Sequence, residues 1–343
     1  SAEMAILYLI DEFEFDLDKL KASLGEKGLN ISFSNVKYPH IAAFIGLDSL
    51  WKFSNAPSFE LCHSQIPTAF FKDIVMDMDV LLIQYGTLQD HTMEEARSCF
   101  LAPIFNCLVA QFGSSIWNKP ESLMNGHIMT RGRIEYHFKT FSALTVIFVE
   151  MKLQIGSVEE SLNAIAQVIA ECNACDWSNM QVNVSMLIYS ILCDGSTFQF
   201  FSFDGSTKPY KFSMGVAPGN CFCVAGGLPL VDFLSESTAH PFIHSLYPIC
   251  TGKTIFNLLL VTYITSLKVF RNRSTSQHGQ RKSLDGWSKA LKFAEEALEK
   301  SQTAEALCKD NLIIDADATA EAALKALRLR YNFCQNFFIF PTS

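Results

Sequence analysis

The sequence has few charged residues and no excess of positive ones. Charged side chains make up 18% of the 343 residues, against about 25% in typical soluble domains, and the formal net charge is −8. Domains that bind nucleic acid over a broad surface usually carry a basic face. Any nucleic-acid site in this chain is therefore expected to be local.

The sequence also lacks a cysteine framework, a signal-like start and an apolar run of membrane length. Its eleven cysteines are dispersed and odd in number, which predicts reduced thiols in an intracellular protein. The apolar residues 5–10 are too few for a signal peptide and follow no basic residues. The apolar segment 254–270 contains several polar residues and falls short of the roughly 20 residues that span a bilayer. We expect a buried core helix there and no membrane contact.

What the sequence does contain is a large apolar fraction. Hydrophobic residues make up 49% of the chain and 29 of them are phenylalanines. A folded protein with a sizeable core is expected, and the length suggests about two domains.

The apolar patterns alternate between strands and helices. The sequence predicts strands over 5–15, 79–85, 184–193, 197–203 and 210–213, and a further strand pair within 131–153 that turns near 139–142. It predicts helices over 16–24, 91–113, 158–175, 284–300 and 317–331. Capping boxes are expected at Thr92 with Glu95 and at Ser157 with Glu160, and a break at Pro103. Asp-Gly pairs at 194 and 204 predict hairpin turns with positive φ at glycine.

The run from Leu144 to Leu153 carries the most chemical information. It is an almost wholly apolar strand that ends with Glu150 and Lys152 two residues apart. Strand side chains alternate between faces, so these two should point the same way, about 7 Å apart along the strand. Unpaired burial of either charge is costly. A carboxylate that binds a hard cation, beside an ammonium that stabilises negative charge on a phosphate, is the chemistry of metal-assisted phosphodiester cleavage.

The order of helix, strand pair, helix and strand over residues 91–215 resembles the PD-(D/E)XK nuclease superfamily. Glu150-Met151-Lys152 stands where that superfamily has its (D/E)-X-K. The upstream acid would be Glu135, where the family usually has Asp after a Pro that this sequence lacks. Gln167 fits a glutamine that some members place on the following helix. More loosely, the segment resembles uncharacterised fungal proteins and Crinkler-type effectors that carry such nuclease-like domains.

The resemblance implies a fold and a set of roles. The fold would be α/β, with an αββαβ core and a mixed sheet over 91–270, an N-terminal α/β region over 1–90, and a basic loop and helical region over 271–343. Glu135 and Glu150 would hold Mg²⁺ or Mn²⁺. Lys152 would activate water or neutralise charge on the phosphate. Gln167 would position the nucleic-acid strand or its phosphate. The partner would be DNA or RNA, contacted through Arg131 and Arg133.

A simpler interpretation of the same residues is a strand-end salt bridge beside a solvated helix face. The protein would then be a catalytically inactive scaffold that binds protein or nucleic acid. A cation between Glu135 and Glu150 would favour the enzyme. A direct bridge from Lys152 to either acid, with no cavity, would favour the scaffold.

Other patterns are weaker. A zinc site formed by four thiolates is not favoured, since the first pair lies in an apolar helix; the thiolates would be Cys172, Cys175, Cys221 and Cys223. Thr251–Thr254 resembles the end of a P-loop, but Tyr247 stands where its first Gly is needed. His240 and His244 lack a helical metal motif. Glu95 either adds a carboxylate behind the metal ligands or on a second metal, or is only part of the helix cap. A basic segment, containing Arg271, Arg273, Arg281 and Lys282, either follows a phosphate backbone or is a solvated linker.

Overall fold

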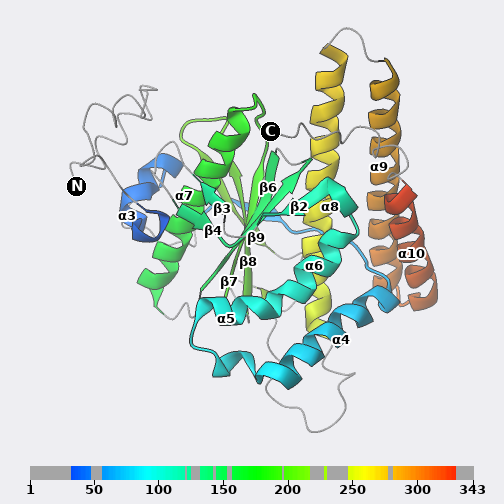
Figure 1. Cartoon of the computed structure of the whole chain (residues 1–343), viewed down its shortest axis with the longest axis horizontal. Helices are drawn as coiled ribbons and strands as arrows, with labels where there is room; N and C mark the ends of the chain where they lie inside the picture. The colour runs from blue at the N-terminus through cyan, green and yellow to red at the C-terminus, as the bar shows by residue number, and fades with distance from the viewer. Residues whose placement is uncertain are drawn as a thin grey trace. The chain divides into compact units, whose positions relative to one another are not determined.

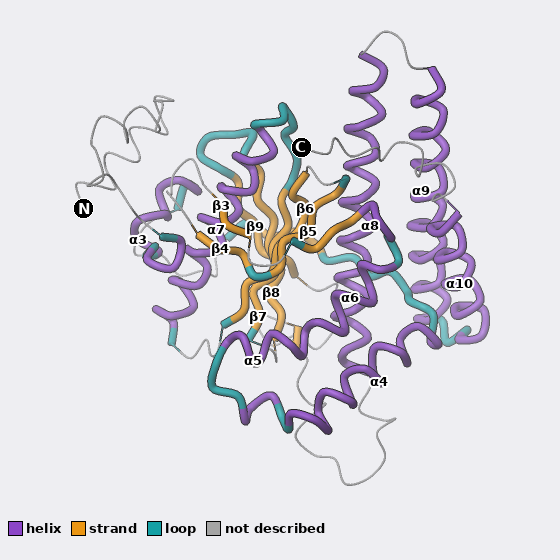
Figure 2. The backbone as a smooth tube through the Cα atoms, in the orientation of Figure 1, coloured by secondary structure: helices purple, strands orange, loops and turns teal. Residues whose placement is uncertain are grey.

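The fold combines an eight-stranded mixed sheet with a helical region toward the C-terminus (Figures 1 and 2). This computed structural model describes residues 32–47, 56–119, 122–124, 132–141, 144–152, 157–194, 197–216, 228–229, 246–276 and 281–329. The predicted α/β class with a mixed sheet is confirmed.

The chain divides into two units that are discontinuous in sequence. The first takes in the described parts of Ser1–Glu60, Asn118–Asp194 and Phe198–Val216. The second takes in those of Leu61–Trp117, Gly195–Thr197 and Ala217–Ser343. The domain boundaries expected at 90 and 270 stay a prediction.

The sheet has the strand order β1-β9-β8-β7-β6-β5-β2 along its main path. Its strands are β1 (Ser58–Glu60), β2 (Ile116–Asn118), β5 (Tyr136–Thr140), β6 (Leu144–Met151), β7 (Ile188–Cys193), β8 (Thr197–Asp204), β9 (Lys211–Val216) and β10 (Leu228–Pro229). A separate antiparallel pair is formed by β3 (Ser122–Met124) and β4 (Gly132–Ile134). Strand β6 is antiparallel to β5 and parallel to β7, so the strand with the Glu-X-Lys end is central.

Helix α7 (Val158–Met180) connects the parallel strands β6 and β7. Parallel neighbours need such a crossover. The predicted capping box begins the helix: Ser157 N–H donates to Glu160 Oε2 (2.9 Å), and Glu160 N–H donates to Ser157 Oγ (3.1 Å). Along the chain, β2, β3 and β4 lie between α6 and β5, and β5, β6, α7 and β7 then follow one another in the predicted order.

The core of the first unit lies between α7 and the sheet. Helix α7 packs on β6 and β7, and α3 (Tyr38–Ile41) packs against α7 (Figure 1). Fully buried aromatic and aliphatic side chains fill this layer, among them Ile165, Ile169, Ile188, Leu192, Phe201 and Phe203. Asn179, near the end of α7, bonds both the N–H (2.8 Å) and the C=O (2.9 Å) of Thr145. This two-point contact fixes the start of β6 against the helix.

The second unit is mainly helical. Its longer helices are α4 (Thr68–Tyr85), α5 (Glu94–Ser98), α6 (Ala102–Ala110), α8 (Leu246–Ser276), α9 (Arg281–Lys309) and α10 (Ile313–Leu329). Short 3₁₀ helices occur in both units, at Phe33–Asn35, Ala42–Ile45, Leu88–Asp90, Cys99–Leu101 and Gly113–Ser115. Helix α8 packs with α9, and α9 packs with α10 (Figure 1).

Several predicted elements differ from the structure. The strand predicted over 79–85 is wrong: it is the end of α4, because a short apolar run alone does not separate strand from helix. The helix predicted over 91–113 is broken into α5, a 3₁₀ turn and α6, with Pro103 in the first turn of α6, as expected. The capping box predicted for Thr92 and Glu95 is also wrong, since α5 begins after Met93 without a side-chain cap. Thr87 and Asp90 form one instead.

Helix α8 corrects the basic loop predicted over 271–282. The helix continues through Arg271 and Arg273 to Ser276, and α9 begins at Arg281. Thr251–Arg273 is long and apolar enough to cross a membrane by length and composition alone, and 72% of its most apolar window is buried inside the protein. A mostly buried core helix meets the same criteria of length and composition. Leu259 and Tyr263 are fully buried, as predicted for a core helix.

The turn predicted near 139–142 is present, with Phe141 at a φ of 50° between β5 and β6. Both Asp-Gly pairs connect antiparallel strands, β7 to β8 and β8 to β9. The positive φ expected at Gly205 is wrong, because the described glycines with positive φ are Gly46, Gly86 and Gly113. The link from β8 to β9 spans residues 205–210, and this longer loop removes the need for a type I′ turn. Residues 5–24 and Gly195 lie outside the described residues.

Replacing Gly205 with alanine should nevertheless destabilise the protein. A Cβ at this position would overlap Oδ2 of Asp176, whose side chain is buried on α7. Displacing it should lower the free energy of unfolding by about 1–3 kcal/mol, measured by urea denaturation.

Gly252 offers a matched control. It lies in α8, and an added Cβ would meet Ile66 Cδ1 at an ordinary 3.5 Å. Gly252→Ala should stabilise the helix by about 0.5–1 kcal/mol. Changes of the same sign in both variants would contradict the assignment of strain to Gly205.

Candidate carboxylate–lysine site

Glu150 and Lys152 meet at the end of β6. Lys152 Nζ lies 2.7 Å from Glu150 Oε1, which confirms that the two side chains share a face. Backbone pairing with β7 continues beyond the end of β6, since Lys152 N–H donates to Cys193 O (2.8 Å). This pairing holds Lys152 in line with the strand and close to Glu150. The Glu150 side chain is 5% exposed and that of Lys152 is 22% exposed. The ion pair is therefore open to solvent on the lysine side.

Gln167 links Glu150 to a second carboxylate on α7. Its Nε2 donates to Glu150 Oε1 (2.6 Å) and to Glu171 Oε1 (2.8 Å). Gln167 and Glu171 are four residues apart and so lie on one helix face. Both are buried, Glu171 completely. The result is a buried chain of three polar groups that ends at Glu171.

The electrostatics of this chain are dominated by negative charge. Burial raises the pKa of Glu171 well above its usual value, and the nearby Glu150 carboxylate raises it further. Glu135 acts in the same direction, whereas the hydrogen bond from Gln167 and the charge of Lys152 oppose the shift. Glu171 Oε2 is buried and has no hydrogen-bond partner. The raised pKa favours the protonated, uncharged form of Glu171.

The other predicted residues have different surroundings. Glu135 is half-buried in a bend between β4 and β5, where its charge acts on Glu171. Arg133 is exposed in β4, and Arg131 lies outside the described residues. Glu95 is exposed in the first turn of α5.

The alternative motifs do not form sites in the described part of the chain. Thr251–Thr254 lies inside α8 and so forms no phosphate-binding loop. Cys172 and Cys175 are buried in α7, and burial raises the pKa of both thiols. The seven cysteines whose side chains the structure describes form no disulfide, and no group of three or more described His, Cys, Asp or Glu side chains is placed to hold a metal ion. Cys221, Cys223, His240, His244 and the side chains of Arg281 and Lys282 lie outside the described residues.

Sequence reasoning missed the importance of Glu171. It continues a polar stripe of Asn163 and Gln167 at four-residue spacing, which is also the pattern of a solvated helix face. The available signal was the run of apolar residues on both sides of that stripe. In the structure, 14 residues of α7 are buried. A helix buried on so much of its surface leaves little room for a solvated stripe.

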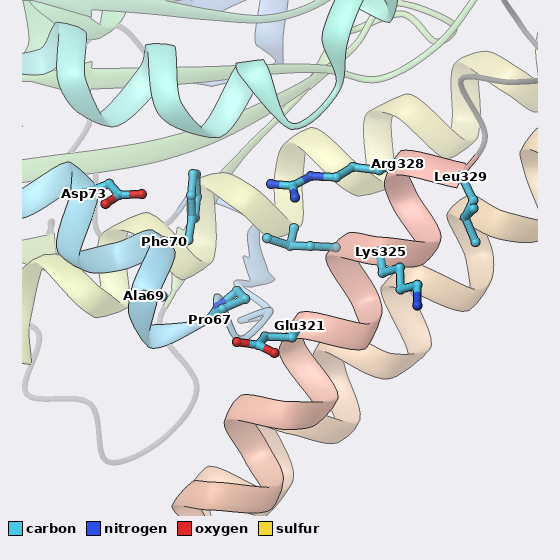
Figure 3. Close-up of a pocket in the computed structure, with 9 residues that line it drawn as sticks. Pro67, Ala69, Phe70, Asp73, Glu321, Lys325, Arg328 and Leu329 are labelled. Carbon is cyan, nitrogen blue, oxygen red and sulfur yellow. The ribbon is translucent and has the colours of Figure 1, made fainter.

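A groove of about 620 Å³ lies elsewhere, between the start of α4 and the end of α10 (Figure 3). Figure 3 shows Phe70 and Asp73 on one side and Lys325 and Arg328 on the other. Arg328 already donates to Gln111 Oε1 (2.7 Å), and Thr68 N–H, at the start of α4, already donates to Asp317 Oδ1 (2.6 Å). None of the predicted site residues lines the groove.

Comparison with known proteins gives little further information. No protein-family model matches the chain, and no curated protein matches it. Among solved structures, it is similar to a chain in a cryo-EM structure of a DrdV–DNA complex, with a TM-score of 0.29 and 9% sequence identity. The match covers 78% of this chain and 26% of the other, so this chain spans about a quarter of that protein's length. A TM-score this low carries no argument about function.

Proposed function

We propose that the protein hydrolyses phosphodiester bonds in nucleic acid with a divalent cation, through a PD-(D/E)XK-like site at the end of β6. One observation carries the proposal: Glu150 Oε1 accepts hydrogen bonds from both Lys152 Nζ and Gln167 Nε2. Two side chains, one at the end of a central strand and one on the helix that follows it, thus bond the same carboxylate oxygen. Their order along the chain is that of the resemblance drawn from the sequence.

The donor set fits a hard divalent cation. Carboxylate oxygens are the ligands that Mg²⁺ and Mn²⁺ prefer. The charges of Glu150, Glu135 and Lys152 all affect the pKa of Glu171. When ionised, these three acids exceed the charge of the one lysine, and a cation would relieve the imbalance. Glu150 would hold it, with a second carboxylate for which the sequence nominates Glu135. When bound, Mg²⁺ or Mn²⁺ polarises the phosphate and lowers the pKa of a coordinated water.

The side chains divide the remaining work. The Lys152 side chain, which is paired with Glu150, is 22% exposed. Its ammonium can therefore contact a phosphate oxygen and stabilise the negative charge that develops there. Gln167 holds the Glu150 carboxylate in one orientation through its 2.6 Å hydrogen bond. Such pre-orientation is worth most at buried positions, and Glu150 is buried.

A catalytically inactive scaffold is the rival proposal, and a specific observation favours it. Lys152 Nζ lies 2.7 Å from Glu150 Oε1, the direct bridge expected of a purely structural pair. A structural salt bridge would use the same atoms and require no cation. The interaction would then serve to close the end of β6 against α7, and any binding of protein or nucleic acid would occur elsewhere on the surface.

A cleavage assay separates the two proposals. We expect the full chain to cleave at least one of single- or double-stranded DNA or RNA in millimolar Mg²⁺ or Mn²⁺. Chelation with EDTA should stop cleavage, and added Mg²⁺ should restore it. If no substrate is cut and neither cation raises the melting temperature, the scaffold is the better account.

A further inference from the structure

Two carboxylates from different elements converge on one atom of this site. Glu150, on β6, and Glu171, on α7, each place Oε1 within hydrogen-bond distance of Gln167 Nε2, at 2.6 and 2.8 Å. Carboxylates repel one another unless something positive lies between them. Here the partly positive amide group lies between them, at a point to which oxygen ligands already converge.

Glu171 has bonding capacity left over. Its side chain is completely buried, and Oε2 has no hydrogen-bond partner. Buried polar atoms without partners are uncommon in folded proteins, and each calls for an explanation such as an ion or a ligand. A carboxylate with one oxygen on Gln167 and one unused is suited to receive a cation.

We propose that Glu171, rather than Glu135, is the second carboxylate of a divalent-cation site shared with Glu150. The proposal rests on the proposed function for its setting and names a ligand of that same site. Two carboxylates are enough for Mg²⁺ or Mn²⁺, which commonly complete their coordination with water and phosphate oxygens. Gln167 keeps its place as the donor that holds Oε1 of both carboxylates, at 2.6 and 2.8 Å.

Burial distinguishes Glu171 from Glu135. Glu135 is half-buried, so solvent can screen its charge. Glu171 and Glu150 are both buried, at 0% and 4% exposure, where solvent screens charge least, so a cation would interact strongly with both carboxylates. Glu135 was nominated only by the resemblance, as the acid upstream of Glu150-Met151-Lys152.

Cation binding can be measured without nucleic acid. The full chain and its variants Glu171→Gln, Glu150→Gln and Glu135→Gln are titrated with Mn²⁺ by calorimetry. Glutamine keeps the size of the side chain and an oxygen that accepts the Gln167 hydrogen bond, but removes the charge. We expect Glu171→Gln and Glu150→Gln each to weaken Mn²⁺ binding by at least about tenfold, and Glu135→Gln to change it by less than about twofold.

Glu171→Asp provides a second variant should Glu171→Gln fail to fold. It retains a carboxylate, so it should bind Mn²⁺ more tightly than Glu171→Gln. Unchanged binding in Glu171→Gln, loss of binding in Glu135→Gln alone, or no Mn²⁺ binding by the unmodified chain would each overturn the inference. Mn²⁺ binding that depends on Glu171, without cleavage of any substrate, would instead overturn the proposed nuclease function and leave the inference standing.

Discussion

Replacing Lys152 with alanine should reduce nucleic-acid cleavage by about 10² to 10⁴-fold, the loss typical of removing a group that acts on the transition state. The fold should change little. The side chain is 22% exposed, and Glu150 keeps its hydrogen bond from Gln167. The loss of stability should therefore be smaller than the few kcal/mol typical of leaving a buried carboxylate without any partner. A large loss of activity in a variant that still unfolds cooperatively would thus assign Lys152 to the reaction. Initial cleavage rates and thermal unfolding provide the two measurements.

Lys300 supplies a matched control for this variant. Its Nζ also lies 2.7 Å from a glutamate oxygen, that of Glu296, but the pair is an exposed one along α9. Lys300→Ala should leave cleavage unchanged. Lys152→Arg adds a second comparison, because arginine keeps the charge but does not lose a proton. Activity in Lys152→Arg would indicate charge stabilisation, and its absence would indicate proton transfer. Equal activity in Lys152→Ala and the unmodified chain would leave only the scaffold.

The placement of Glu150 and Lys152, and the start of the helix after them, could be predicted from the sequence because both depend on local rules. Alternation along an apolar strand brings Glu150 and Lys152 to one face, and Ser157 with Glu160 begins the helix that carries Gln167. Each of these needs only a few consecutive residues. The strand pair, the crossover helix and the hairpins follow from the same kind of pattern.

The rest depends on tertiary packing, which local patterns do not contain. The strand predicted over 79–85 belongs to an 18-residue helix whose apolar end looks the same in either structure. Arg271 and Arg273 resemble a linker by charge, yet α8 continues through them. Glu171 resembles a solvated residue until the sheet is known to cover its face of α7. Which side of a helix is covered is decided by elements distant in sequence.

Replacing Lys253 with methionine should destabilise the protein by about 3 kcal/mol, because it leaves a buried carboxylate without its partner. Lys253 Nζ, on α8, lies 2.8 Å from Glu305 Oε2, on α9, and the two side chains are only 8% and 11% exposed. His63 Nδ1 lies 3.8 Å from the other carboxylate oxygen and also lowers the pKa of Glu305. The contact with Lys253 is the shorter of the two, so we expect its loss to have the larger effect. The free energy of unfolding in urea gives the measurement.

The same two helices contain the control. Lys268 on α8 pairs with Glu295 on α9 at 3.0 Å, but both side chains are about half exposed, at 49% and 48%. Lys268→Met should cost less than about 1 kcal/mol. Similar losses in both variants would show that burial does not strengthen the Lys253–Glu305 pair, contrary to the argument. A double replacement of Lys253 by Met and Glu305 by Leu should recover much of the stability, since no charge is then left buried.

The Lys253–Glu305 pair should also make stability depend on pH in one direction. Burial alone would raise the pKa of Glu305, but His63 and Lys253 together lower it from 4.5 to about 2. An acid with a lowered pKa in the folded state stabilises that state fully above its unfolded pKa. The contribution is lost as the pH falls from about 4.5 toward 2. The stability difference between the unmodified chain and Lys253→Met should therefore shrink as the pH falls toward 2, where Glu305 is protonated in both proteins. A difference that grows on acidification would contradict an ionised Glu305 as the partner of Lys253.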